Sequence, residues 1–316
     1  MKKKLTQPAG VCLLALLCCA LWGSAFPCIK IGYEWFAIEG VGSQILFAGY
    51  RFFLSGVFTF LLGCVLEKRV LTMKRTSFPC ILRQGIVQTT IQYVCFYIGL
   101  AHTTGTKGSI INGSNAFFSI IVAHFLIKNE KMTWTKSLGC LFGLMGVVVI
   151  NLAPGALAGG FHIMGEGMVL LCSLAYGVST VLLKMISDRE SAMTITAYQT
   201  LLGGFLLILI GFALGGKVGG GDLKSLCLLV YMALLSTGAF SIWTLLLKYN
   251  PVGKVAIYGF TIPIFGVVLS ALFLGEQIIS FQNILALVLV SLGIWITYRD
   301  MEAKTDGNGR DRETYV

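Results

Sequence analysis

The stretch LWGSAFPCIK (residues 21–30) lies inside a long apolar segment, and yet it contains a glycine, a proline and a lysine. It returns in weaker form as AYGVSTVLLK (residues 175–184), which keeps the glycine and the lysine and lacks the proline. Because Pro27 removes a backbone donor, it bends any helix that contains it. The stretch therefore predicts a bent apolar helix near the start of the chain and a related helix near its middle.

The composition indicates a membrane protein. Of the 316 residues, 56% are hydrophobic and only 12% are charged, and the mean hydropathy is +0.83. A soluble domain of this length has no interior large enough for so much apolar surface, whereas a lipid bilayer accommodates it. The net charge of +10 comes from basic residues scattered between apolar runs, which is not the clustered pattern of a nucleic-acid-binding face.

The ten cysteines show no Cys-x-x-Cys pair and no His–Cys spacing, and most of them lie within apolar runs. Cysteines in such places act as small apolar side chains. We therefore expect no disulfide, no metal site and no cofactor.

Ten segments reach or approach the length of about 20 largely apolar residues that a spanning helix needs. These predicted spans are residues 11–32, 44–66, 84–101, 108–127, 137–153, 165–186, 192–214, 225–247, 255–275 and 278–298. The sequence therefore predicts an all-α integral membrane protein with ten transmembrane helices.

The loops between these spans alternate in their content of basic residues. One set holds most of the lysines and arginines, whereas the other set holds only Lys107, Lys217 and Lys224. Because basic residues collect on the cytoplasmic side of a membrane, both termini are predicted to be cytoplasmic. Residues 300–316, which are charged and contain glycine, are predicted to form a disordered cytoplasmic tail. The absence of a long targeting segment favours a bacterial inner membrane.

The chain contains an internal repeat. Gly23 precedes Lys30 by seven residues, and Gly177 precedes Lys184 by the same distance. Further pairs follow in the same order: AGYRFFLSG (48–56) with AYQTLLGG (197–204), HTTGTKGSIIN (102–112) with YNPVGKVAIYG (249–259), FLIKNE (125–130) with LFLGE (272–276), and GVVVI (146–150) with GIWIT (293–297).

The repeat divides the chain into two units, residues 1–153 and 154–299, each with five predicted spans. Because five is odd, the two units enter the membrane in opposite directions. This 5+5 inverted-topology repeat is typical of transporters that alternate access around a central site.

Four stretches resemble the EamA-type families of the drug/metabolite transporter superfamily: LWGSAFPCIKIG, YRFFLSG, FLIKNEKMTWTKSLGCLFGLMGVVVI and FTIPIFGVVLSALFLGEQIISFQ. The resemblance covers nearly the whole chain as two EamA-like units. It implies ten helices, an inverted repeat and solute transport. Members of these families move amino acids, other metabolites or cationic drugs, so the resemblance does not select a substrate. Asn283 and Leu285 stand where the family usually keeps a small-residue glycine motif.

Two cations within the predicted spans are candidate substrate ligands. Lys30 lies near the outer end of the first span, and Arg51 lies inside the second. Because a charge within lipid is costly, such residues usually face a cavity or a partner. They are predicted to attract an anion together; alternatively, Lys30 extends to the interface and Arg51 pairs with Glu34, Glu39 or a helix end. The repeat places Gln199 near the position of Arg51, where its amide binds substrate or bridges helices.

The third and fourth spans carry the richest group of polar side chains. Its candidate substrate-binding residues are Gln88, Gln92, Asn112 and Asn115. Amides that face lipid lack partners, so these side chains should face inward, either to bind substrate or to join helices. In the second half, Trp243 and Tyr258 are candidates for an aromatic wall of the same site.

Four residues are candidates for moving parts. Pro27 and Pro263 are predicted to lie deep in spans, as hinges beside the cavity or as static kinks. Glu130 and Glu276 follow the fourth and ninth spans, and each is predicted to cap a helix or to form a gate contact.

The sequence argues against an enzyme, because it has no HExxH, GxSxG or paired acidic motif and no Asp or Glu in the middle of a span. It predicts a secondary transporter that exports an amino acid or a related carboxylate-bearing solute. An exporter of cationic amphiphiles and a membrane-embedded lipid-modifying enzyme are the alternatives. The predicted partners are a small-molecule substrate and the bilayer, with proton or counter-solute coupling, in a monomer or homodimer.

Overall fold

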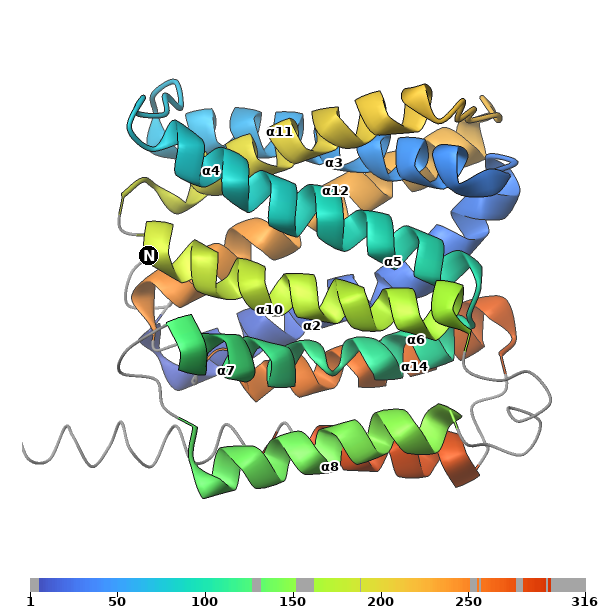
Figure 1. Cartoon of the computed structure of the whole chain (residues 1–316). Coiled ribbons are helices and arrows are strands. Elements are labelled where there is room, and N and C mark those ends of the chain that lie inside the picture. The colour runs from blue at the N-terminus through green and yellow to red at the C-terminus, as the bar shows by residue number, and fades with distance from the viewer. Residues whose placement is uncertain are drawn as a thin grey trace, which may run out of the picture.

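The computed structural model describes residues 6–126, 132–151, 162–187, 189–250, 255, 257–276, 281–293 and 295–296. Every regular element within these residues is helical (Figure 1). The α-helices are α2 (Pro8–Trp35), α3 (Gly40–Glu67), α4 (Phe78–Gln84), α5 (Gln92–Ala101), α6 (Gly105–Asn112), α7 (Asn115–Leu126), α8 (Trp134–Asn151), α10 (Met168–Ile186), α11 (Ala192–Ala213), α12 (Leu223–Tyr249), α14 (Thr261–Leu274) and the helix Phe281–Gly293.

Among the described residues, six helical segments are long and apolar enough to cross a membrane, so the chain is an integral membrane protein. They are Pro8–Trp35, Gly40–Glu67, Gly105–Leu126, Ile163–Ile186, Ala192–Ala213 and Leu223–Tyr249. Each of them overlaps one predicted span. The predicted span 84–101 is part of a longer helical segment, residues 78–101, in which α4 and α5 are joined by the π-helical turn Gly85–Ile91.

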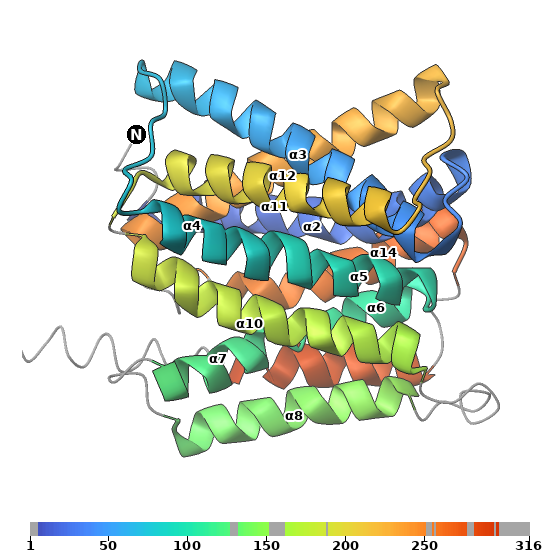
Figure 2. The same ribbon diagram turned by 45° about the horizontal axis from the view of Figure 1, so that its top comes forward.

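Helices α3 and α11 lie side by side and run antiparallel (Figures 1 and 2). Three glycines of α3, spaced seven residues apart, face α11: Gly42, Gly49 and Gly56. A Cβ atom at these positions would lie 2.8 Å from the Leu214 oxygen, 2.7 Å from the Ile208 nitrogen and 2.6 Å from the Leu201 nitrogen, respectively. Only glycine permits this approach, because a real Cβ atom does not pack that closely. The heptad spacing therefore turns one face of α3 into a smooth contact surface for α11.

Gly23 and Gly177, the glycines of the two related stretches 21–30 and 175–184, make equivalent contacts. A Cβ atom at Gly23 of α2 would lie 3.0 Å from the backbone nitrogen of Gly266 in α14. A Cβ atom at Gly177 of α10 would lie 2.9 Å from the backbone nitrogen of Ser119 in α7. The first helix of each sequence unit is therefore packed, through its glycine, against a helix of the other unit.

The segment that contains α6 and α7 is interrupted in its middle. Gly113 and Ser114 form a turn between the two helices, and the Gly113 and Ser114 N–H groups donate to the carbonyls of Ile110 and Ile111. A Cβ atom at Gly113 would lie 2.6 Å from the Val290 side chain, so glycine is required at the break. Breaks of this kind in a spanning segment occur where the backbone faces protein or a cavity.

The two candidate hinge prolines occupy different settings. Pro27 lies inside α2, as predicted, and deprives the Gly23 carbonyl of its helical donor. Pro263 is not deep in a helix: it lies in the first turn of α14, directly after the 3₁₀ turn Ile257–Phe260. A proline in a first turn breaks no helical hydrogen bond, so Pro263 marks a helix start rather than a kink.

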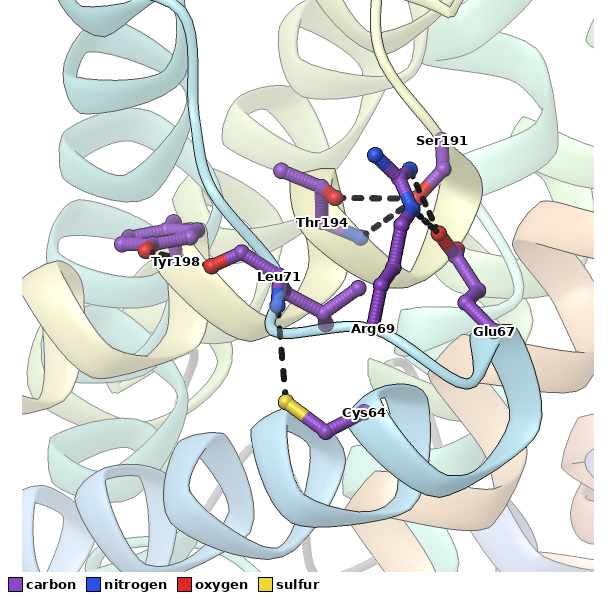
Figure 3. Close-up of polar contacts among 7 residues, drawn as sticks. All are labelled: Cys64, Glu67, Arg69, Leu71, Ser191, Thr194 and Tyr198. Carbon is purple, nitrogen blue, oxygen red and sulfur yellow. Dashed lines mark hydrogen bonds and ion pairs between the residues drawn. The ribbon is translucent and has the colours of Figure 1, made fainter.

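The connection after α3 folds back onto α3 and α11 (Figure 3). The Leu71 N–H donates to Cys64 Sγ at 3.4 Å, and the Tyr198 hydroxyl donates to the Leu71 carbonyl at 2.9 Å. The Leu71 side chain is fully buried against Met193. Helix α11 itself begins with a capping bond, in which Ser191 Oγ accepts from the Thr194 N–H at 3.1 Å.

Candidate functional site

A small cavity of about 40 Å³ lies at the centre of the helices. Its polar wall consists of Arg51, Gln92, Tyr93, Asn112, Asn115 and Tyr176. Its aromatic wall consists of Trp22, Phe26, Phe96 and Phe240. Both sequence units contribute to it, through α2, α3, α5, α10, α12, α14 and the break between α6 and α7. This volume suffices for roughly two to four water molecules.

Arg51 is the charged residue of this cavity, and only 1% of it is exposed. Its Nε donates to the Met232 carbonyl at 3.3 Å and to Ser236 Oγ at 3.1 Å. Its Nη1 donates to the Tyr97 hydroxyl at 3.1 Å, and its guanidinium carbon lies 4.9 Å from the centre of the Phe52 ring. These bonds occupy two of the five guanidinium N–H groups, which leaves donors for a further acceptor.

No carboxylate in the described part of the chain forms an ion pair with Arg51. The alternative in which Glu34 or Glu39 pairs with it is wrong, because both glutamates line a separate, open recess together with Lys30. The two cations thus do not share one cavity. Lys30 belongs to the recess at the end of α2, whereas Arg51 belongs to the central cavity.

The position of Arg51 is fixed by the helices around it. Tyr97, which receives its hydrogen bond, is fully buried, and its carbonyl accepts from the Tyr33 hydroxyl of α2 at 2.6 Å. One turn further along α3, Ser55 Oγ and Thr237 Oγ1 of α12 are 3.2 Å apart and hydrogen bonded. Contacts from α2, α5 and α12 therefore hold the guanidinium in place.

The amides of the cavity differ in how their oxygens are used. Asn112 Oδ1 accepts from Cys172 Sγ at 4.0 Å, a weak bond. Gln92 Oε1 and Asn115 Oδ1 are buried and have no hydrogen-bond partner. Asn112 and Asn115 flank the helix break, and Gln92 follows the π-helical turn, so both irregular segments place amides at the cavity.

The aromatic wall is supported from behind. The Trp22 and Phe240 rings are in edge-to-face contact, with their centroids 5.7 Å apart. The centroid of the Trp243 ring lies 4.9 Å from that of the Trp22 ring. On the other side, the Phe26 and Phe96 rings are 5.3 Å apart. Trp243 is therefore a support of the cavity wall and does not line the cavity itself.

Three further predicted residues also lie away from the cavity. Gln88 is buried, and its Oε1 accepts from Gln84 Nε2 at 2.7 Å. Gln199 is 1% exposed and lies beside Gly85. Tyr258 is half-buried in the cluster that contains Trp243, and its carbonyl accepts from Thr261 Oγ1 at 2.7 Å.

Two glutamates hold the connection between α5 and α6. Glu276 Oε1 and Oε2 accept from the Gly105 and Thr106 N–H groups, both at 2.8 Å. Glu166 Oε1 accepts from Thr103 Oγ1 at 2.9 Å and lies 3.9 Å from Lys107 Nζ. Glu276 thus caps the start of α6. Its predicted counterpart, Glu130, lies outside the described residues.

Sequence reasoning missed several residues of the site. Tyr97 stands four residues after Tyr93, so helical spacing alone places both on one face. Trp22 and Tyr176 each precede a glycine of the repeat, Gly23 or Gly177, and both line the cavity. The repeat therefore contained the signal for these two cavity residues.

Comparison with known proteins gives a consistent assignment. The profile of the EamA-like transporter family matches residues 9–152 and 163–299. The uncharacterized transporter YetK of Bacillus subtilis is 25% identical over 80% of this chain and 77% of its own length. A probable amino-acid metabolite efflux pump of Salmonella typhimurium is 24% identical over 90% of this chain and 93% of its own length. A crystal structure superposes with a TM-score of 0.69 at 16% identity, over 93% of this chain and 99% of that chain, which shows the shared fold.

The helical architecture and the central polar cavity are those of a membrane transporter. Because the two family matches together cover most of the residues, the chain belongs to the EamA-like transporter family.

Proposed function

We propose that the protein exports an amino acid or a related carboxylate-bearing solute, and that Arg51 binds the carboxylate. The supporting observation is a cation that is 1% exposed, lines the central cavity and has no carboxylate partner in the described part of the chain. An uncompensated charge inside a membrane protein is costly, so residues of this kind usually serve function. A substrate carboxylate supplies the missing charge and the acceptors for the free N–H groups.

The direction and the substrate class rest on similarity. The Salmonella typhimurium relative is described as a probable amino-acid metabolite efflux pump, which favours export of a solute with a carboxylate. The alternative, an exporter of cationic amphiphiles, is favoured by the aromatic wall of Trp22, Phe26, Phe96 and Phe240. It is disfavoured by Arg51, because a cationic solute in the same cavity meets a like charge at short range.

We propose alternating access between two units, residues 1–153 and 154–299, that form a ten-helix, 5+5 inverted repeat with cytoplasmic termini and a tail at 300–316. The antiparallel contact of α3 with α11 and the matched contacts of Gly23 and Gly177 favour this arrangement. Glu166 and Glu276 of the second unit accept hydrogen bonds from residues 103–106 of the first. We assign these contacts to the closed outer side of the transporter, and a hinge role to Pro27 in α2.

In this mechanism Lys30, in its open recess, attracts anions at the outer vestibule and does not bind substrate in the central cavity. Gln88, Gln199, Trp243 and Tyr258 support the helices that form the cavity. We propose that the protein resides in the bacterial inner membrane, where a proton or counter-solute gradient drives transport.

A thermal-stability panel on the purified protein tests the proposal. Ligand binding to the folded state raises the melting temperature, so amino acids and simple carboxylates should stabilise the wild-type protein, whereas amines and cationic drugs should not. Arg51→Gln should abolish the stabilisation and the uptake of the same solutes into proteoliposomes. Stabilisation of Arg51→Gln equal to that of the wild type would remove Arg51 from the site. Stabilisation of the wild type by cationic drugs alone would favour the alternative.

A further inference from the structure

We propose that the oxygens of Gln92 and Asn115 form a subsite for the ammonium group of the substrate, so that the cavity selects α-amino acids over carboxylates that lack an amine. This inference rests on the proposed function, because it presupposes that Arg51 binds the carboxylate of the same molecule.

The subsite is marked by unused hydrogen-bond acceptors. Gln92 is 5% exposed and lines the cavity, and its Oε1 has no partner. Asn115 lines the same cavity, and its Oδ1 is also buried without a partner. Buried carbonyl oxygens are normally hydrogen bonded, so these two acceptors are available to a donor that enters the cavity.

Some neighbouring buried amides are hydrogen bonded, whereas Gln44 and Gln84 have Oε1 atoms without a partner and do not line the cavity. Gln88 stands four residues before Gln92, but its oxygen is occupied by Gln84 Nε2. Asn112 stands on the other side of the helix break from Asn115, and its oxygen accepts from Cys172 Sγ. Gln199 Oε1 also lacks a partner, but Gln199 does not line the cavity.

The charge of the cavity restricts what this donor is. Among the described residues that line the cavity there is no carboxylate, so the protein offers no counter-charge to a free cation. A solute that carries only an amine is repelled by Arg51, whereas a zwitterion brings a carboxylate for Arg51 and an ammonium for the two oxygens. The rings of Trp22 and Phe240 face the same space and favour a cation near their π-surfaces.

The irregular backbone explains why the oxygens are available. Gln92 follows the π-helical turn Gly85–Ile91, and Asn115 follows the turn at Gly113 and Ser114. Helix interruptions in spanning segments often mark substrate sites, because they let polar groups face the cavity. Here both interruptions place one amide at the start of a helix and at the cavity.

The test compares three matched series of solutes on the full-length protein in detergent. Each series contains an amino acid, its hydroxy analogue and the unsubstituted acid: alanine, lactate and propionate; leucine, leucic acid and isocaproate; phenylalanine, phenyllactate and phenylpropionate. The concentration for half-maximal thermal stabilisation gives an apparent affinity for each solute. In the wild type, the best-bound amino acid should bind at least about tenfold more tightly than its unsubstituted acid, the gain of one charged hydrogen-bonded group.

Two variants and one control locate the effect. Gln92→Met and Asn115→Leu remove an acceptor at nearly constant volume, and each should shrink the preference for the amino acid while leaving the affinity for the unsubstituted acid within about twofold. Gln88→Met removes an amide of the same helical segment that does not line the cavity, and it should leave the preference unchanged. Melting temperature without ligand reports whether each variant is folded.

The outcomes separate this inference from the proposed function. If the unsubstituted acids bind as tightly as the amino acids, and Arg51→Gln abolishes both, the ammonium subsite is overturned and the carboxylate site stands. If a preference exists but survives in both Gln92→Met and Asn115→Leu, these residues do not form the subsite. If none of the nine solutes stabilises the wild type, the proposed function itself fails.

Discussion

Helices α3 and α11 occupy matched places in the two sequence units, and they differ at the position of Arg51. Both use glycines seven residues apart to approach each other: Gly42, Gly49 and Gly56 on α3, and Gly204 and Gly211 on α11. On α3, Arg51 lies between Gly49 and Gly56 and lines the cavity, whereas its repeat counterpart Gln199 precedes Gly204 on α11 and lies in the packed interior. The packing glycines are therefore shared by the two units, and the charged residue Arg51 is present in only one.

Helices α2 and α10 show the same division. Gly23 and Gly177 make equivalent close contacts, and Trp22 and Tyr176 both line the cavity. The residue four positions after the glycine is Pro27 in α2 and Val181 in α10, so only α2 loses a helical hydrogen bond at that point. The two units thus share their packing glycines, whereas Arg51 and Pro27 occur only in the first unit. Replacing Arg51 or Pro27 by its counterpart from the second unit tests this division.

The largest effect on stability is expected from a substitution in the glycine contact between α3 and α11. Gly49→Leu places a Cβ atom 2.7 Å from the Ile208 nitrogen, and it adds further carbons in a contact with no space for them. Overpacking of this kind costs about 1–3 kcal/mol or more, so the variant should lose several degrees of melting temperature or fail to fold. Thermal unfolding in detergent and the yield of monodisperse protein on size-exclusion chromatography measure this.

The matched control is a glycine with room around it. At Gly238 in α12, the nearest atom to a built Cβ is Leu21 Cδ1 at 3.8 Å. Gly238→Ala should be neutral or slightly stabilising, because alanine favours a helix over glycine by about 1 kcal/mol. Equal losses in Gly49→Leu and Gly238→Ala would show that the glycine stripe has no special role.

A smaller, functional effect is expected at the asymmetric proline. Pro27→Val installs the counterpart residue and restores a donor for the Gly23 carbonyl, so the helix should straighten and become more stable by a few tenths to about 1 kcal/mol. If Pro27 is a hinge, transport should slow several-fold while the affinity for the transported solute stays the same. Initial uptake rates in proteoliposomes, together with ligand-induced thermal shifts, separate the two quantities. An unchanged rate in a stabilised variant would reduce Pro27 to a static kink.

The smallest effect on recognition is expected at Gln199. Gln199→Leu replaces an amide side chain that does not line the cavity by an apolar one of similar size. Affinity for carboxylate solutes should therefore stay within about twofold of the wild type. The comparison between the units predicts that this change is far milder than Arg51→Gln. A loss in Gln199→Leu as large as in Arg51→Gln would mean that α11 contributes to the site as much as α3.

Much of the helical arrangement was predictable because spanning segments are set by apolar length. The six long apolar segments each overlap a predicted span, with ends that differ by a few residues. The break at Gly113 and Ser114 was not predicted, because a short turn inside an apolar run leaves hydropathy almost unchanged. Pro263 was misplaced for a related reason, since the 3₁₀ turn before α14 has the composition of a helix.

The site was only partly predictable because its members meet through packing between distant segments. Arg51, Gln92, Asn112 and Asn115 do line the cavity, since polar side chains within apolar runs have few other places to go. The expectation that Lys30 and Arg51 attract an anion together assumed that both point into one space, and the recess at the end of α2 separates them. The partners of Arg51, Ser236 and Tyr97, carry no sequence signal that links them to it.

The connection after α3 has a mechanical consequence for the proposed alternating access. Leu71 is tied to α3 through Cys64 and to α11 through Tyr198, next to the glycine contact between the same two helices (Figure 3). Helices α3 and α11 are thus packed together along their length and connected again at one end through Leu71, although they belong to different sequence units. In the proposed rocking motion we expect this pair to stay assembled and the opening to fall on the opposite side, where Glu166 and Glu276 bridge the units at residues 103–106.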